Sequence, residues 1–217
     1  MEEARFKRID AVLEDPQKNI WVGDFGNCAL RKIADGRVTT VVPPDRACPK
    51  ADPENHLVYD HFAWDPKAGE LIAAGTHLWR GPPTGDNFFS SIWRVSPDGA
   101  MKRVYLAKAL GSGLNSGLGQ IGGLALDRAG AIWISQGLYA GTSEGTRIVR
   151  VEAGGRAVRV AGSPLPVNVD HADGPALEAL FSNDMTSMCF DAQDTLFIHV
   201  RNMIRKMTRG RVTSWAY

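Results

Sequence analysis

Cysteine is scarce in this 217-residue chain, and the few cysteines do not form a metal-binding or redox motif. They are Cys28, Cys48 and Cys189, an odd set without CxxC spacing. Such a set is typical of reduced thiols, and we expect a cytoplasmic protein if Met1 is the natural start. If Met1 replaces a removed signal peptide, a Cys28–Cys48 disulfide and a secreted protein are the alternative.

Long apolar runs and an excess of one charge are also lacking. The first residues, Met1–Lys7, contain no apolar stretch of the kind found in a signal peptide. No run approaches the roughly 20 apolar residues that a membrane-spanning helix needs. The net charge is only +1, which gives no overall attraction to nucleic acid or to anionic membranes. We therefore expect neither a membrane nor a nucleic acid as a partner.

Helix signals are weak, and the best candidate is Pro175–Phe181, where the proline suits a first helical turn. What the chain does contain is a pattern that occurs four times. Each copy has an apolar segment, an Asp, a tight turn and further strand-like segments rich in Val, Ile and Trp. The copies are Ala11–Val42, Phe62–Leu106, Leu124–Ala161 and Met188–Tyr217, and the recurring aspartates are Asp15, Asp65, Asp127 and Asp191.

Tandem four-stranded units predict an all-β protein. In the third copy the strands are expected at 123–126, 131–135, 147–151 and 157–160. We predict one β-propeller domain over residues 1–217, with four recognisable four-stranded blades. Arg5–Leu13 would supply the first strand of blade one, or would pair with the last blade across the seam.

Residues of the first and third copies match a known repeat. They are Asn19–Asp24 and Leu30–Ile33 in the first copy, and Gly123–Asp127, Gly130–Ile134 and Arg147–Val151 in the third. These segments resemble NHL repeats. The resemblance implies a propeller but not one function, because such propellers serve many roles.

NHL propellers usually have six blades, and this chain has four copies. The ring is therefore either a closed four-bladed propeller or part of a larger ring. An open arc would leave the apolar flanks of its first and last blades exposed. Closure or self-association is the physical expectation.

Loop lengths divide the predicted propeller into two unlike faces. The turns between strands one and two, and between strands three and four, are short and rich in Gly, Pro, Asp and Asn. On the opposite face the connections are long, and long ordered loops are often functional. We expect the functional surface on this long-loop face, around the central channel. Its connections run over residues 43–60, 76–90, 107–122, 137–146 and 162–186.

Histidine is concentrated on the long-loop face, and the short turns contain none. Histidine exchanges protons near neutral pH and is a common metal ligand. Carboxylates next to imidazoles suit either a metal site or an oriented general base. The candidate residues of this kind are His56, His61, His77, His171, Asp60, Asp170 and Asp173.

An enzyme is one interpretation of these residues. His61, His171 and Asp173 would be the catalytic residues of a small-molecule hydrolase, lyase or cyclase. A divalent metal, Zn²⁺ or Ca²⁺, would be held by His56, His61 and His171 with a position open for water. NHL-related lyases use a histidine-bound metal in their channel, so the resemblance supports this alternative. The plainer interpretation is loop histidines hydrogen-bonded to nearby groups, because no HxH or HExxH spacing is present.

Aromatic residues cluster around the Pro/Gly-rich stretch of residues 78–89. They would form a ligand wall or a protein contact, or would shield the edge of blade two. With the first alternative, the protein is a non-enzymatic recognition propeller that binds a protein, a peptide or a small ligand, and this is our primary prediction. The expected ligand-binding residues are Asp60, His77, Trp79, Phe88, Phe89 and Asp170.

A single basic run lies near the C-terminus. Alternating strand geometry divides its charges between two sides and a turn, which favours a solvated outer blade over a nucleic-acid surface. The run consists of Arg201, Arg205, Lys206, Arg209 and Arg211.

Overall fold

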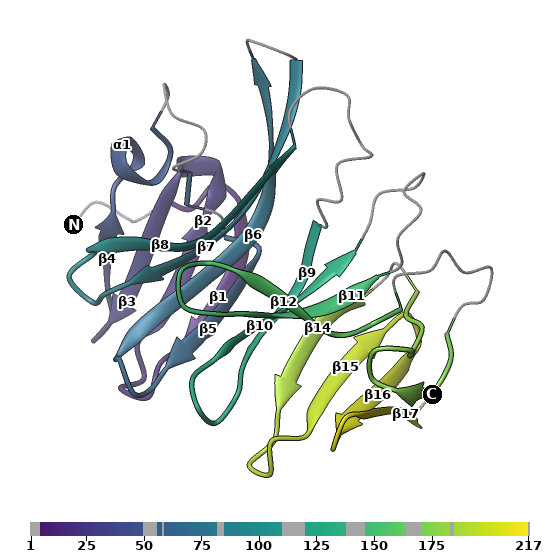
Figure 1. The fold of residues 1–217 in the computed structure, drawn as a ribbon. Coiled ribbons are helices and arrows are strands. Elements are labelled where there is room, and N and C mark those ends of the chain that lie inside the picture. The colour runs from purple at the N-terminus through teal and green to yellow at the C-terminus, as the bar shows by residue number, and fades with distance from the viewer. Residues whose placement is uncertain are drawn as a thin grey trace.

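Four antiparallel sheets follow one another along the chain (Figure 1). The structure is a computed structural model that describes residues 5–49, 56–57, 59–81, 85–109, 120–137, 146–163, 171–182 and 185–216. Three sheets have four strands and the last has five. The prediction of an all-β protein made of four-stranded units is confirmed.

The strands of each blade pair in chain order. Blade one contains β1 (Ile9–Glu14), β2 (Ile20–Asp24), β3 (Ala29–Ala34) and β4 (Arg37–Val42). Blade two contains β5 (His61–Asp65), β6 (Glu70–Gly81), β7 (Gly85–Val95) and β8 (Met101–Ala109). Blade three contains β9 (Gln120–Leu126), β10 (Ile132–Gly137), β11 (Arg147–Val151) and β12 (Ala157–Ala161). Blade four contains β14 (Met185–Phe190), β15 (Leu196–Val200), β16 (Met203–Thr208) and β17 (Arg211–Ala216), with β13 (Gly174–Pro175) added beside β17.

The helices differ from the prediction. Pro175–Phe181 is not a helix: β13 pairs with β17, and a single turn follows in which the Ala179 amide donates to the Pro175 carbonyl at 2.9 Å. The short α1 (Pro44–Ala47) and the single 3-10 turn η1 (Phe25–Asn27) lie instead in and after blade one. Among the described residues, no helix has the length and apolar character needed to cross a membrane.

The segment of residues 76–90 is not a loop. Strands β6 and β7 pair without a break from Leu71↔Val95 to Gly81↔Gly85, and β8 joins them as far as Phe88↔Ala109. The result is a long hairpin that stands above blade two in Figure 1. The long-loop face therefore carries a regular β-arm at this place.

The recurring Asp fixes the first turn of each blade. In blade one, Asp15 Oδ1 accepts hydrogen bonds from the Gln17 and Asn19 amides, each at 2.9 Å. Its Oδ2 accepts one from the indole nitrogen of Trp21 at 2.9 Å. Burial would raise the pKa of Asp15, but these hydrogen bonds hold it below the usual value. The repeat signal in the sequence is thus a structural carboxylate that joins turn and core.

Apolar clusters fill the spaces between successive blades. Trp21 of blade one packs against Trp64 of blade two, with ring centroids 5.9 Å apart. Between blades three and four, Trp133 lies edge-on to Phe190 at 5.3 Å. Side chains of β6, β7, β9 and β10 fill the space between blades two and three. Blades two and three therefore each have one face against the blade before and another against the blade after.

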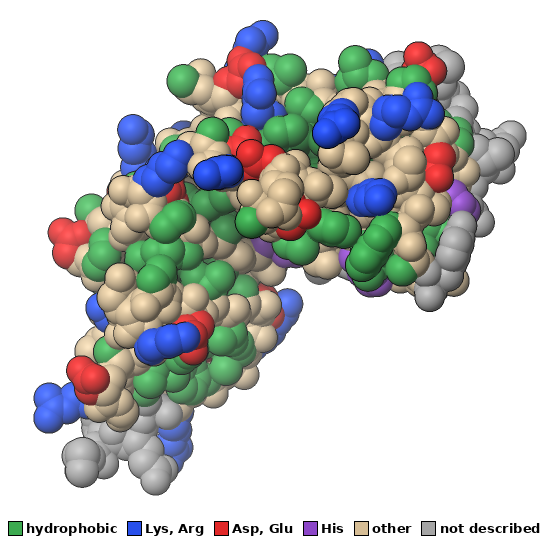
Figure 2. Space-filling model, turned by 90° about the horizontal axis from the view of Figure 1, so that it is seen from below, with side chains coloured by type: hydrophobic (Ala, Val, Ile, Leu, Met, Phe, Trp, Pro, Cys, Tyr) green, Lys and Arg blue, Asp and Glu red, His purple; other side chains and the backbone are tan. Residues whose placement is uncertain are grey.

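The inner strands contact one another in chain order, β1 with β5, β5 with β9, and β9 with β14. In the described part of the chain, no comparable contact joins β1 to β14. Figure 2 shows two lobes that meet at an angle around a hollow. Strand β1 belongs to blade one by its pairing with β2, as the first alternative for Arg5–Leu13 proposed.

The cysteine prediction is wrong for two of the three thiols. Cys28 and Cys48 form a disulfide, which was the alternative, whereas Cys189 is free and exposed. The bond ties the residue after η1 to the end of α1, across the strands β3 and β4. The linker that leaves blade one is therefore held against that blade.

Candidate functional site

Polar side chains gather where the inner strands begin, at the long-loop end of the blades. Asp60 precedes β5, and its Oδ2 accepts a hydrogen bond from the Thr76 amide of β6 at 2.9 Å. The Thr76 hydroxyl lies 2.7 Å from the Ser90 hydroxyl and accepts the Ile121 amide at 3.0 Å. His61 Nε2 lies 3.3 Å from the Ile121 carbonyl oxygen. Blades two and three are thus joined through the groups that position Asp60 and His61.

Burial has opposite effects on these two titratable groups. It raises the pKa of Asp60, and the negative charge of Asp10 adds to the rise, while the Thr76 amide and His61 oppose it. Burial lowers the pKa of His61, although Asp60 and the Ile121 carbonyl act against the change. His61 is therefore neutral at neutral pH. If Nε2 carries the proton donated to Ile121, Nδ1 is left as an acceptor.

Asp10 of β1 completes this group of residues. One of its oxygens, Oδ1, accepts a hydrogen bond from Arg8 Nε at 2.8 Å. The other, Oδ2, is buried and has no hydrogen-bond partner among the described residues. Because buried carboxylate oxygens are almost always satisfied, this one marks a place for water or for a donor group of a ligand. We call Asp10, Asp60, His61 and Thr76 the inner-strand site.

Three other predicted residues come together beside the long hairpin. His56 stacks on His77 with ring centroids 4.9 Å apart, and His77 stacks on Phe89 at 5.2 Å. His56 Nε2 lies 3.2 Å from the Pro49 carbonyl, and its own carbonyl accepts the Trp93 indole N–H at 3.1 Å. Phe89 is only 3% exposed. The stack packs the base of the hairpin, and Phe89 is therefore a buried side chain rather than an exposed one.

Asp173 lies at the outer edge of blade four. It accepts hydrogen bonds from Arg205 Nη2 and from the Ser214 amide, both at 2.8 Å. Burial would raise the pKa of Asp173, but these donors lower it. Arg205 itself is fully buried, against the expectation of a solvated basic run, and it also donates to the Ala172 and Leu180 carbonyls. This carboxylate fastens the linker of residues 171–182 to β16 and β17.

The histidines predicted as metal ligands do not assemble. His56, His61 and His171 are all described, and the described residues contain no group of three or more His, Cys, Asp or Glu side chains placed to hold a metal ion. His171 is half-buried in the linker before blade four, next to Ala172, which pairs with Leu180. Asp170 and the side chains of Trp79 and Phe88 lie outside the described residues.

Sequence reasoning found Asp60 and His61 and missed Asp10 and Thr76. Asp10 lies in the segment expected to be the first strand, where alternation of polar and apolar residues hides a single carboxylate. Thr76 lay in a segment expected to be a loop. Asp10 could have been found from its position, because it lies at the start of an expected inner strand, and the start of an inner strand faces the mouth of the channel.

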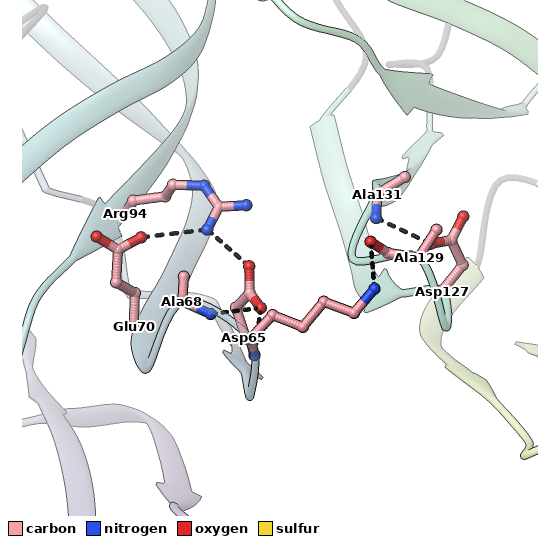
Figure 3. Close-up of polar contacts among 8 residues, drawn as sticks. Asp65, Ala68, Glu70, Arg94, Asp127, Ala129 and Ala131 are labelled. Carbon is pink, nitrogen blue, oxygen red and sulfur yellow. Dashed lines mark hydrogen bonds and ion pairs between the residues drawn. The ribbon is translucent and has the colours of Figure 1, made fainter.

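The short-turn end of the blades also has a defined structure (Figure 3). Arg94 of β7 donates to Asp65 at 2.8 Å and to Glu70 at 3.2 Å. Lys67 crosses to blade three and donates to the Ala129 carbonyl at 3.0 Å. A hollow of about 550 Å³ lies here between the ends of β5, β9 and β14. Its polar groups are largely occupied by turn contacts, so this end serves to hold blades together.

No known protein-family model matches this sequence, and the search of curated proteins finds no match. Solved structures do resemble the chain. A luciferin-regenerating enzyme superposes with a TM-score of 0.53 and 13% identity, covering 96% of this chain and 61% of the enzyme. The extracellular domain of a protein described as a hybrid two-component system from B. thetaiotaomicron gives 0.53 and 11%, covering 95% of this chain and 21% of that one.

Virginiamycin B lyase from Staphylococcus aureus gives a TM-score of 0.47 and 14% identity, covering 96% of this chain and 69% of the lyase. At such identities a likeness shows the fold alone. The fold is propeller-like, and the structures that share it include enzymes and other classes of protein.

Proposed function

We propose that this chain is an NHL-like propeller that binds a small ligand, or an end group of a peptide, at the inner-strand site. The observation that carries the proposal is the buried Asp10 Oδ2, which has no partner among the described residues. The site offers hydrogen-bond acceptors from Asp10 and from neutral His61. These groups suit a ligand rich in donors, such as a polyol or an amine.

Positioning supports the same proposal. Asp60 and Thr76 are held by hydrogen bonds that run from β5 to β7 and β9. A site supported in this way on strands of two blades keeps its geometry without a ligand, which lowers the cost of binding. The long hairpin β6–β7 stands beside the site and would supply further contacts on the same face.

A second candidate, a hydrolase, lyase or cyclase without a metal, is favoured by the His61–Asp60 pair. Burial keeps His61 neutral and therefore able to accept a proton from a substrate. Asp60 lies next to it, and its charge would stabilise the imidazolium that forms. His61 would act as the base and Asp60 as the group that stabilises its protonated form.

The test is a thermal-shift screen with a panel of monosaccharides, polyamines and short peptides. We expect at least one of these classes to raise the Tm of the wild-type protein, and Asp10→Asn and His61→Gln to reduce that rise strongly. Asp35→Asn is the matched control, because Asp35 lies in an exposed short turn. An equal rise in all four proteins, or no rise with any compound, would contradict the proposal.

A further inference from the structure

Packing between blades within this chain follows one pattern, which defines two faces of a blade. The back face contacts the preceding blade, and the front face contacts the following one. In each of the three interfaces, a large side chain near the end of the inner strand of the later blade meets the front face of the earlier blade. These side chains are Trp64, Leu126 and Phe190.

The front face of blade four has the same residue pattern as the front face of blade three, which packs against blade four. In blade three this face has a row of a small residue, an aromatic residue and a basic residue across three neighbouring strands, and it packs against Phe190. Blade four has the same kind of row in the same register. The two rows are Ala125–Trp133–Arg150 and Cys189–Phe197–Lys206.

This front face is exposed in the single chain. Trp215 of β17 lies edge-on to Phe197 with ring centroids 5.1 Å apart, yet Trp215 is 56% exposed. Cys189 is exposed as well. An aromatic pair at the surface, arranged as in the interfaces between blades, indicates a face that packs against another blade.

The back face of blade one is exposed in a corresponding way. Ile9 and Val12 of β1 are 49% and 57% exposed. Val12 stands opposite Val22, which is only 3% exposed and is paired in turn with Arg31. The next row of the same face carries Ile20 and Ile33, both only partly buried. This face therefore keeps exposed apolar side chains at Ile9 and Val12, and no blade of the described residues packs on it.

We propose that two copies of this chain assemble head to tail, with the front face of blade four in each copy on the back face of blade one in its partner. The contact would follow the arrangement of the interfaces between the chain's own blades, with Glu14 of β1 at the position that Trp64, Leu126 and Phe190 occupy in the other blades. Four blades from each copy give eight, which lies within the usual range of about 4–8 for propellers. A head-to-tail contact that closes after two copies leaves no exposed end face.

Charge also fits this arrangement. The back face of blade one carries the acidic Glu14, which pairs with Lys18 at 2.6 Å, and the front face of blade four carries Lys206. Opposite charges at the rims of the two faces favour this pairing over contacts between two like faces. The inference goes beyond the proposed ligand binding, because the residues of the inner-strand site all come from one copy.

The test measures the mass of the purified chain in solution by light scattering over a range of concentrations. We expect twice the protomer mass of 23.6 kDa for the wild type. Val12→Lys changes only the back face and Trp215→Ser only the front face, and each is expected to give monomers. Leu177→Lys is the control, because Leu177 is 51% exposed but lies in the linker outside both faces.

Mixing the two variants distinguishes head-to-tail pairing from other dimers. A mixed pair of Val12→Lys and Trp215→Ser copies retains one wild-type interface, so the mixture should recover part of the dimer. Three results would overturn the proposal. The wild type could be a monomer at every concentration, neither substitution could weaken the dimer, or only one of the two substitutions could weaken it.

Cys189 supplies an independent readout that needs no variant. Its thiol lies on the front face of blade four, and the other two cysteines are joined in a disulfide. We expect a thiol reagent to label native protein on the order of tenfold more slowly when it is concentrated than when it is dilute, since mass action favours the dimer. A labelling rate that does not depend on protein concentration would contradict the proposed interface.

Discussion

At the scale of single residues, buried carboxylates have two distinct roles in this protein. Asp15 and the fully buried Asp24 are satisfied by several donors, and their pKa values lie below the usual value, although burial alone would raise them. Asp60 has a raised pKa because burial outweighs its hydrogen bonds. The first kind of carboxylate stabilises the fold, and the second kind belongs to the site at which we propose that a ligand binds.

Removing the structural carboxylate of blade one should weaken the fold. Asp15→Ala leaves the Trp21 indole N–H and two backbone amides without their acceptor. Because a buried donor without a partner costs about 1–3 kcal/mol, the free energy of unfolding should fall by roughly that amount. Urea denaturation measures it, with Asp35→Asn as the control. A loss no larger than that of the control would show that the recurring Asp is dispensable.

Acid should destabilise the protein through the same groups. The folded-state pKa values of Asp15, Asp24 and Asp65 are lowered. Their contribution to the free energy of unfolding is therefore complete above the pKa of the unfolded state, about 3.8. It is lost as the pH falls through the folded values, because the unfolded state then binds more protons. We expect the free energy of unfolding to drop steeply below about pH 4. A flat profile there would contradict these assignments.

His61 should add a separate pH dependence near neutrality. Its folded-state pKa is lowered, so the unfolded chain takes up a proton first as the pH falls through about 6.5. Stability should therefore decrease from about pH 7 to pH 5, and His61→Gln should flatten that slope. Unfolding curves at several pH values measure it. An unchanged slope in the variant would place the titrating group elsewhere.

At the scale of elements, the linkers are held to the blades by few but specific bonds. The Cys28–Cys48 disulfide fixes α1 to blade one, and Asp173 with Arg205 fixes the linker before blade four. The first joins two connecting segments, and the second joins a connecting segment to the strands β16 and β17. They hold α1 and residues 171–182 in defined positions against their blades.

The disulfide should contribute measurably to stability. It closes a loop between residues 20 positions apart, and cross-links over such loops are worth roughly 2–4 kcal/mol. Cys28→Ser with Cys48→Ser should lower the free energy of unfolding by about that amount. Cys189→Ser is the matched control and should change it little. Equal effects of the two changes would argue against a disulfide in the folded protein.

Periodic features of these elements were predictable from the sequence. The recurring Asp and the Val, Ile and Trp segments located the strands of blade three to within a few residues, since strands have strong local signals. The hairpin at residues 76–90 was missed because Gly and Pro at its tip indicate a loop, whereas pairing is decided by the partner strand. The buried Arg205 was missed because its acceptors are carbonyls of a distant linker.

At the scale of the whole molecule, the sequence indicated which ends of the blades carry the long connections, and it indicated two of the four residues of the proposed inner-strand site, Asp60 and His61. Loop lengths indicated the correct end for Asp60 and His61. Which histidines meet depends on how connections fold over the blades, and no local pattern encodes that. His56 joins His77 rather than His61, and Asp173 joins Arg205.

Binding of a donor-rich ligand beside His61 and Asp10 is the proposal on which the function of this protein rests. The most direct measurement follows the imidazole ring proton of His61 by NMR, assigned with His61→Gln, while monosaccharides, polyamines and short peptides are added. We expect that a compound that binds shifts the His61 signal in the wild type and not in Asp10→Asn. A compound that binds the protein and leaves the His61 signal unchanged would contradict it.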